Sequence, residues 1–134
     1  MSKTLIFTAT YNEKDNIKIL IEKLNKLNVD LDILVIDDYS PDKTWEILQK
    51  LEKEIKNLKI IIRKKKSGLD TAHKLAFEYA KNHNYEKFIS MDADLSHDPS
   101  EVPKIINILN ESSFVIGSRY IKGGRCEMTG YRLA

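Results

Sequence analysis

Residues 33 to 51 read ILVIDDYSPDKTWEILQKL and change from an apolar run to an acidic turn and then to a helical pattern. The first four residues have the length and β-branched content of a buried strand. Ser40 and Pro41 indicate a helix start, because serine can cap free amides and proline suits the first turn. The inward face of this helix is predicted to carry Trp45, Leu48, Leu51 and Ile55. The stretch therefore predicts a strand, a turn and a helix in that order.

The same alternation continues along the chain. Further strands are predicted at residues 5–7, 60–62, 88–91 and 114–116. The other helices are predicted from apolar stripes at Ile17, Leu20, Ile21, Leu24 and Leu27, at Leu69, Ala72, Ala76 and Ala80, and at Val102, Ile105, Ile106 and Leu109. Asp98 and Glu101 form a capping-box pattern before the last helix, and residues from Lys122 onward are predicted to be loop. Alternating strands and helices require crossover connections, which predicts an α/β, Rossmann-like, mainly parallel open sheet with helices on both faces.

Composition restricts the classes of protein to be considered. The 134 residues suit one domain, and 22 basic against 20 acidic side chains give a net charge of +2, which provides no reason to expect nucleic-acid binding. A single cysteine favours a reducing compartment, so a cytoplasmic location is the default expectation. No apolar run reaches the roughly 20 residues of a bilayer span, so any membrane contact of this chain is expected to be peripheral.

Acidic residues directly follow the predicted strands. In an open α/β sheet ligands bind beyond the carboxyl ends of the strands, so these side chains are expected to converge at one edge. Asp92 and Asp94 are two apart, and on extended backbone their carboxylates would point the same way toward one cation. Oxygen ligands suit Mg²⁺ or Mn²⁺, and a diphosphate would complete the shell. The alternative is that Asp94 begins a turn and Asp98 caps a helix, with no metal.

Asp37 and Asp38 follow the strand at residues 33–36, where backbone alternation must send one side chain inward and the other to the opposite face. We assign Asp38 to accept hydrogen bonds from a donor base and Asp37 to hold loop amides. The alternative interpretation makes both of them solvated turn residues.

The first loop offers Tyr11 and Glu13 to pack against and hydrogen-bond a nucleotide, whereas Asn12 alternatively caps the first helix. The basic run at residues 63–66 is interpreted first as a solvated strand end and second as an attractor for phosphates or an anionic membrane. His97 is left out of the cation site, because a hard metal prefers oxygen.

Five segments in order resemble glycosyltransferase family 2, in particular its group of polyprenyl-phosphate sugar transferases. They are TYNEKDNI, VIDDYSPDKT, SGLDTA, MDADLSHDP and GSRYIKGG, at residues 10–17, 35–44, 67–72, 91–99 and 117–124. The resemblance implies a GT-A fold and inversion at the sugar carbon with Mg²⁺ or Mn²⁺. It further implies transfer of a hexose from GDP-mannose or a UDP-hexose to a polyprenyl or dolichyl phosphate, with mannose as the first choice of sugar.

The resemblance assigns roles residue by residue. Donor binding falls to Ala9, Tyr11, Glu13, Ile36, Asp38, Asp92, Ala93, Asp94, Ser96 and Arg119. Metal binding falls to Asp92, Asp94 and Ser96, where Ser96 occupies a position at which some members use Gln. The catalytic set is Asp94, Arg119 and Arg132, with the two arginines at positions associated with phosphate recognition. Residues 1–134 are thus predicted to form one nucleotide-sugar-binding domain.

Several features depart from the family pattern. Ala9 stands where Pro is frequent, and Tyr39, Lys43 and Asp70 stand where Gly is frequent, which leaves the donor open. The family's catalytic region ordinarily continues beyond Ala134, so the acceptor-side part is expected to be missing. Peripheral contact at the cytoplasmic face of a membrane and formation of a homo-oligomer through the exposed surface are both considered. The alternatives are a noncatalytic nucleotide-sugar-binding domain and, at lower rank, a receiver-like signalling module.

Overall fold

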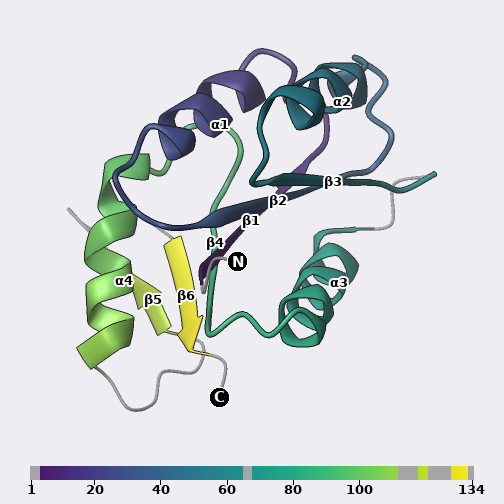
Figure 1. Cartoon of the computed structure of the whole chain (residues 1–134). Coiled ribbons are helices and arrows are strands. Elements are labelled where there is room, and N and C mark those ends of the chain that lie inside the picture. Colours follow the sequence, from purple (N-terminus) through teal and green to yellow (C-terminus); the bar gives the residue numbers. More distant parts are fainter. Residues whose placement is uncertain (1–3, 65–67, 112–117, 121–127, 133–134) are drawn as a thin grey trace.

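The computed structural model describes residues 4–64, 68–111, 118–120 and 128–132, with side chains described at 4–64, 68 and 70–109. Helices and strands alternate along the chain (Figure 1). The strands are β1 (Thr4–Thr10), β2 (Asp32–Asp37), β3 (Leu58–Ile62), β4 (Lys87–Ser90), β5 (Ser118–Tyr120) and β6 (Met128–Arg132). The helices are α1 (Ile17–Asn25), α2 (Thr44–Glu54), α3 (Leu69–Asn82) and α4 (Val102–Glu111), with a 3₁₀ turn, η1 (Pro99–Glu101), before α4.

The strands form one sheet in the order β3-β2-β1-β4-β6-β5. Its first four strands are parallel, whereas β6 runs antiparallel to both β4 and β5. The chain adds β2 and β3 on one side of β1 and then returns to place β4 on the other side. This reversal creates a switch point between β1 and β4, where open α/β sheets bind their ligands.

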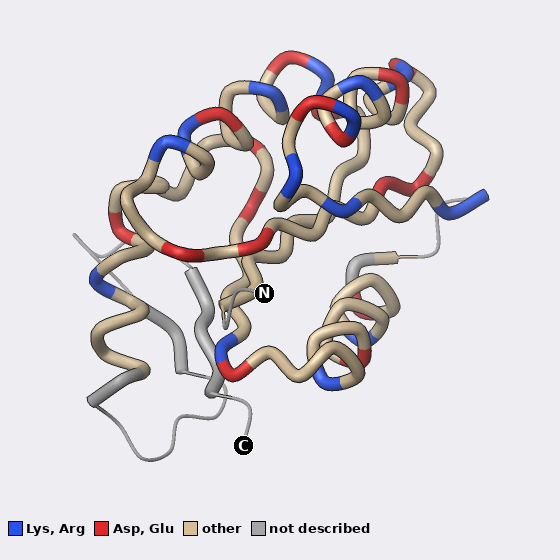
Figure 2. The backbone as a smooth tube through the Cα atoms, in the orientation of Figure 1, with Lys and Arg blue, Asp and Glu red and all other residues tan. Residues whose placement is uncertain are grey.

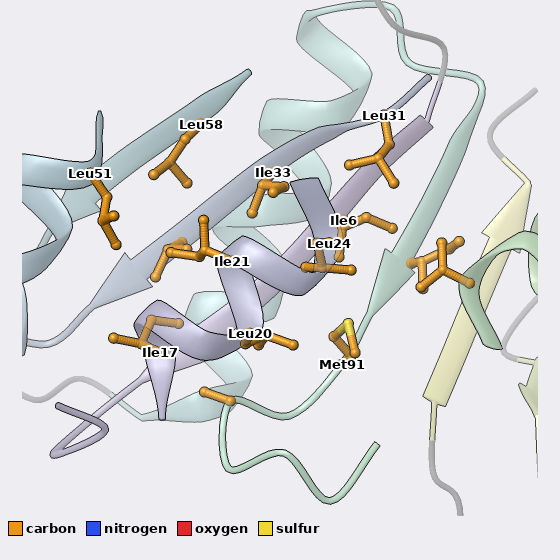
Figure 3. Close-up of a cluster of buried hydrophobic side chains, with 14 of the residues drawn as sticks. Ile6, Ile17, Leu20, Ile21, Leu24, Leu31, Ile33, Leu51, Leu58 and Met91 are labelled. Carbon is orange, nitrogen blue, oxygen red and sulfur yellow. The ribbon is translucent and has the colours of Figure 1, made fainter. Parts of the chain in front are cut away.

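Helices cover both faces of the sheet, as predicted. Figure 3 shows α1 lying over the sheet, with Ile17, Leu20 and Leu24 directed into a buried cluster that includes Ile6 and Ile33. Residues from α2 and α4 belong to the same cluster. The opposite face carries a second cluster in which the small side chains of α3 pack on Phe7 and Phe88. Residues 5 and 7 thus face α3, while residue 6 faces α1. This alternation is expected of a central strand that is buried on both faces of the sheet.

Three local predictions are corrected. The region after Lys122 is not all loop, because β6 forms there and pairs with β4 from Lys87 to Ser90. Ser40 does not cap α2, which begins at Thr44 after Lys43. Asn12 does not cap α1 either, since that helix begins at Ile17 after Asn16. The predicted strand at 114–116 lies outside the described residues.

Asp98 caps the 3₁₀ turn η1 rather than α4 itself, since its side chain accepts from the Ser100 amide at 3.0 Å and α4 begins only at Val102. Acidic and basic residues are interspersed along α1, α2 and α3 (Figure 2).

Among the residues that the structure describes, no helix combines the length and the apolar character that crossing a bilayer requires.

Candidate functional site

A cavity of about 290 Å³ lies at the carboxyl ends of β1, β2 and β4, beside the switch point. Its walls come from four separate segments of the chain. The lining residues are Ala9, Thr10, Tyr11, Glu13, Asp38, Gly68, Ala72, Asp92, Ala93 and Asp94. Four of these carry carboxylates, so the cavity concentrates negative charge where the parallel strands end.

The loops after β1 and β2 are braced against each other by reciprocal hydrogen bonds. The Asn12 amide donates to Ser40 Oγ at 3.0 Å, and the Asp42 amide donates back to Asn12 Oδ1 at 3.2 Å. The Glu13 amide donates to Thr44 Oγ1 at 3.2 Å. Asn12 adopts a φ of 57°, a left-handed conformation that asparagine tolerates better than most residues. This brace, the contacts among residues 12, 13, 40, 42 and 44, fixes the loop that presents Tyr11 and Glu13.

Asp37 and Asp38 have different roles, as backbone alternation predicts. Asp37 is fully buried and accepts hydrogen bonds from Thr10 Oγ1 at 2.6 Å, Ser40 Oγ at 2.6 Å and the Ser40 amide at 3.0 Å. It therefore holds a loop amide, which confirms that part of the assignment. Asp38 instead faces the cavity.

The Asp38 carboxylate forms a bidentate ion pair with Arg63. Nε donates to Oδ1 at 2.5 Å and Nη2 to Oδ2 at 2.9 Å. The Arg63 side chain is only 15% exposed, so the first residue of the basic run is not the solvated strand end that was our first interpretation. The planar guanidinium thus donates two parallel hydrogen bonds to the carboxylate, which is the strongest geometry of an arginine–carboxylate ion pair.

Asp92 and Asp94 both line the cavity, although their backbone differs from the one expected. Ala93 and Asp94 lie in a turn rather than on extended strand. Ser96 donates two hydrogen bonds to the Asp94 carboxylate, one from its hydroxyl and one from its backbone amide. These bonds hold the pKa of Asp94 below the usual range, and the hydroxyl has the larger effect. Asp94 is thus kept ionised. The turn that the alternative interpretation required does form, and it brings both carboxylates to one cavity all the same.

His97, which the sequence analysis left out of the cation site, has a structural role in this turn. The ring is buried, and its Nδ1 accepts from the Asp92 amide at 3.1 Å. Leu95 adopts a φ of 65°, which lets the chain reverse between the two residues. The signal in the sequence was a histidine five residues after the strand-end aspartate, a spacing that means nothing until the turn is known.

The predicted site residues are only partly brought together. Ile36 is buried in the cluster beneath α3, and Ser96 supports Asp94 without being among the lining residues. Arg119 in β5 pairs with Thr129 of β6, which in turn pairs with Ser90 at the carboxyl end of β4. Arg132 of β6 pairs with Lys87, at the opposite end of β4. The side chains of both arginines lie outside the described residues, so their roles stay predictions.

Two departures from the family pattern keep a glycine-like backbone. Tyr39 and Lys43 have φ values of 51° and 65°, in the left-handed region that side chains disfavour. Tyr39 is 54% exposed and stacks on Trp45, with ring centroids 5.3 Å apart. The β2–α2 loop therefore places two non-glycine residues in the left-handed region.

The family model for glycosyl transferase family 2 matches residues 5–129. The chain belongs to glycosyltransferase family 2. The match includes β1 from Leu5 onward, all of β2 to β4 and every residue that lines the cavity. Membership of this family leaves the receiver-like alternative without support.

This family 2 chain is similar to curated proteins that carry polyprenyl-phosphate mannosyltransferase names. It is 40% identical over 128 residues to the dolichol-phosphate mannosyltransferase of Pyrococcus furiosus, with 93% of this chain and 35% of that relative covered. It is 31% identical over 123 residues to the undecaprenyl-phosphate mannosyltransferase of Micrococcus luteus, with 92% and 51% covered. The chain thus spans between about a third and a half of the length of these relatives.

Among solved structures, the family 2 chain resembles the mannosyltransferase PcManGT from Pyrobaculum calidifontis, a complex with GDP-Man and Mn²⁺. The TM-score is 0.81 at 17% identity, covering 97% of this chain and 44% of that one. At this identity the likeness shows the fold alone, and it confirms the GT-A fold expected from the sequence.

Proposed function

We propose that this chain forms the donor-binding part of an inverting glycosyltransferase. The enzyme would move a hexose from a nucleoside-diphosphate sugar to a polyprenyl or dolichyl phosphate, with mannose as the first choice of sugar. The supporting observation is the cavity at the switch point, where Asp38, Asp92 and Asp94 meet. The names of the relatives from P. furiosus and M. luteus support the acceptor class.

The cavity divides into two ends by charge. At one end Arg63 neutralises Asp38, so a nucleobase meets a fixed acceptor without excess charge. At the other end Asp92 and Asp94 carry charge that would repel a diphosphate. A bound nucleoside diphosphate therefore needs a counter-charge at that end. Tyr11, 37% exposed at the cavity wall, offers a face for the base or ribose to pack against.

The residues present fit Mg²⁺ or Mn²⁺. Asp92 is 58% exposed, and Asp94 is held ionised by Ser96, so both can offer carboxylate oxygens. Within the described part of the chain, no group of three or more His, Cys, Asp and Glu side chains forms a metal cage. Two carboxylates suit a cation that takes its remaining ligands from phosphates and water. When bound, such a cation would offset the charge that develops on the leaving nucleoside diphosphate.

Transfer would break the bond between the anomeric carbon and the diphosphate oxygen, and the electron pair would stay on the nucleoside diphosphate. A lone pair of the acceptor phosphate would form the new carbon–oxygen bond from the opposite face, which inverts the configuration. A lipid phosphate is substantially ionised near neutral pH because its second pKa is about 6, so it needs no strong protein base. We assign Arg119 and Arg132 to the acceptor phosphate as the resemblance implies, since guanidinium groups bind phosphate through paired hydrogen bonds.

The second candidate is a domain that binds the donor without transferring sugar. The chain spans 35% and 51% of the lengths of these two relatives, so donor binding and sugar transfer are tested separately for this stretch of sequence. The two candidates share the cavity and differ only in turnover. We further propose a single domain that works at the cytoplasmic face of a membrane through peripheral contact; formation of a homo-oligomer stays a prediction.

Two measurements test the proposal. Calorimetric titration of the chain with GDP, UDP and their hexose conjugates, with and without Mn²⁺, is expected to show binding that depends on the cation. Incubation with radiolabelled donor and polyprenyl phosphate is expected to yield labelled lipid. Donor binding without labelled lipid would favour the noncatalytic candidate, and no cation-dependent binding of any nucleoside diphosphate would reject both.

A further inference from the structure

The Arg63 guanidinium joins three segments that meet at the base end of the cavity. Besides its two bonds to Asp38, Nη1 donates to Thr71 Oγ1 at 2.8 Å and Nη2 donates to the Gly68 carbonyl at 3.0 Å. The Thr71 hydroxyl donates to the same carbonyl at 2.9 Å. At the backbone, the Arg63 amide donates to the Asp37 carbonyl at 2.8 Å. One side chain thus connects the end of β2, the end of β3 and the start of α3.

The contacts of Arg63 reach the cavity wall on two sides. Asp38, Gly68 and Ala72 all line the cavity, and Arg63 bonds directly to the first two of them. Gly68 has a φ of 95° and space around its Cα, so the turn before α3 depends on its backbone conformation rather than on packing. The Arg63 bond to its carbonyl is therefore a specific restraint on that turn.

We propose that Arg63 is the positioning residue for nucleobase recognition, holding Asp38 as a rigid charged acceptor and joining it to the turn at Gly68. This inference rests on the proposed function, because it takes the cavity to hold a nucleotide. A carboxylate paired with arginine accepts hydrogen bonds and donates none. The base end therefore selects a ring edge that donates a ring N–H, as guanine and uracil do, over adenine, whose corresponding ring nitrogen accepts.

Lysine cannot replace Arg63 in this arrangement. Its ammonium is a point charge with three rotatable donors, whereas Arg63 uses a planar fork for Asp38 and further N–H groups for Thr71 and Gly68. A purely electrostatic role would survive the change to lysine. A positioning role would not survive it in full, and the two roles can thus be distinguished.

Calorimetric titration in the presence of Mn²⁺ tests the inference with GDP, UDP, ADP and inorganic pyrophosphate as probes. We expect the wild-type chain to prefer GDP or UDP over ADP by about tenfold or more, within the range that one charge-assisted pair supplies. Arg63→Gln is expected to remove most of that preference while changing pyrophosphate affinity by less than about twofold, and Arg63→Lys is expected to restore it only in part. Lys59→Gln, an exposed charge loss on the same strand, is the matched control and leaves the preference intact.

Action through Asp38 is tested by combining variants. If Arg63 positions Asp38, then Asp38→Ala with Arg63→Gln loses no more nucleobase preference than Asp38→Ala alone, because the two groups act as one unit. Should Arg63→Gln fold poorly, Thr71→Val removes one anchor of the guanidinium at an exposed site and is expected to give a smaller loss in the same direction. Additive losses would overturn the inference.

The remaining outcomes are also decisive. Equal weakening of nucleotide and pyrophosphate by Arg63→Gln, or full rescue by lysine, would show a general charge or folding role and overturn the positioning role. An unchanged preference in Arg63→Gln would overturn it as well. A wild-type chain that binds pyrophosphate with Mn²⁺ but no nucleoside diphosphate more tightly would overturn the proposed function and this inference with it.

Discussion

Asp92 and His97 are joined by a hydrogen bond from the Asp92 amide to Nδ1 of the histidine, at 3.1 Å. The other ring nitrogen, Nε2, lies 3.7 Å from Asp92 Oδ2. The imidazole is 1% exposed, so its position is set by packing. It therefore fixes the backbone of one proposed cation ligand, Asp92.

Replacing His97 should separate the loss of the hydrogen bond from the loss of bulk. His97→Leu leaves the Asp92 amide without its acceptor and is expected to lower the free energy of unfolding by about 2 kcal/mol. His97→Asn keeps an acceptor at a similar place and is expected to lose less. Urea denaturation measures the first effect, and Mn²⁺-dependent GDP binding should follow the same order. Equal losses in both variants would contradict the assigned hydrogen bond.

Asp94→Asn should remove the cation-dependent part of nucleotide binding. The amide keeps the shape of the side chain but supplies one neutral oxygen, which is a poorer ligand for a hard cation. Titration with GDP or UDP is expected to give the same weak affinity with and without Mn²⁺. Asp30→Asn, at an exposed position before β2, is the control and should behave as the wild type. Unchanged Mn²⁺ dependence in Asp94→Asn would remove this residue from the site.

Ser96→Ala should raise the pKa of Asp94. The folded protein lowers this pKa mainly through the Ser96 hydroxyl, so the stabilisation it gives is present above the ordinary value near 3.9 and is lost as pH falls through the folded pKa. Without the hydroxyl, the ionised form should be lost at higher pH. Carbon-13 NMR titration of the carboxyl measures the change, and Ser100→Ala, an exposed serine nearby, should leave it unaltered.

Asp37→Ala should destabilise the fold more than any change at the cavity surface. Its carboxylate satisfies the Thr10 hydroxyl and both polar groups of Ser40 within the core, so removal is expected to cost about 3 kcal/mol. Thermal and urea unfolding measure the loss. Asp30→Ala should be nearly neutral, and a similarly small effect at Asp37 would show that water replaces the carboxylate.

Lys43→Gly should stabilise the chain. The residue precedes α2 at a φ of 65° with an exposed side chain, and relief of left-handed strain is expected to exceed the added backbone entropy by about 0.5 kcal/mol. Lys50→Gly, inside α2, should instead destabilise by about 1 kcal/mol. Denaturant midpoints of the two variants should therefore move in opposite directions, and a lower midpoint for Lys43→Gly would refute the strain.

The parallel half of the sheet could be predicted because its strands and helices carry hydrophobic periodicity that only one layer arrangement can bury. The strand at 33–36 and the stripe on α1 are examples. β6 was missed because MTGYR contains a glycine and little alternation, and its order depends on pairing with β4 rather than on its own pattern. Local signals fail where a distant partner supplies the hydrogen bonds.

The site was also predictable only in part: its strand-end carboxylates were foreseen, but two residues that support the cavity were not. Strand-end aspartates converge because parallel strands end at one edge, which placed Asp38, Asp92 and Asp94 at one cavity. Ser40 was misread as a cap because the chain turns through a left-handed Lys43, and no residue type there signals it. Arg63 was missed because a basic run gives no sign of which member turns back toward a carboxylate.

The brace between the loops after β1 and β2 has a thermodynamic consequence. Asn12, Ser40 and Asp42 already satisfy one another, so this wall of the cavity is built before any ligand arrives. Little conformational freedom is left there for a guest to freeze, and the entropic penalty of association is reduced on that side.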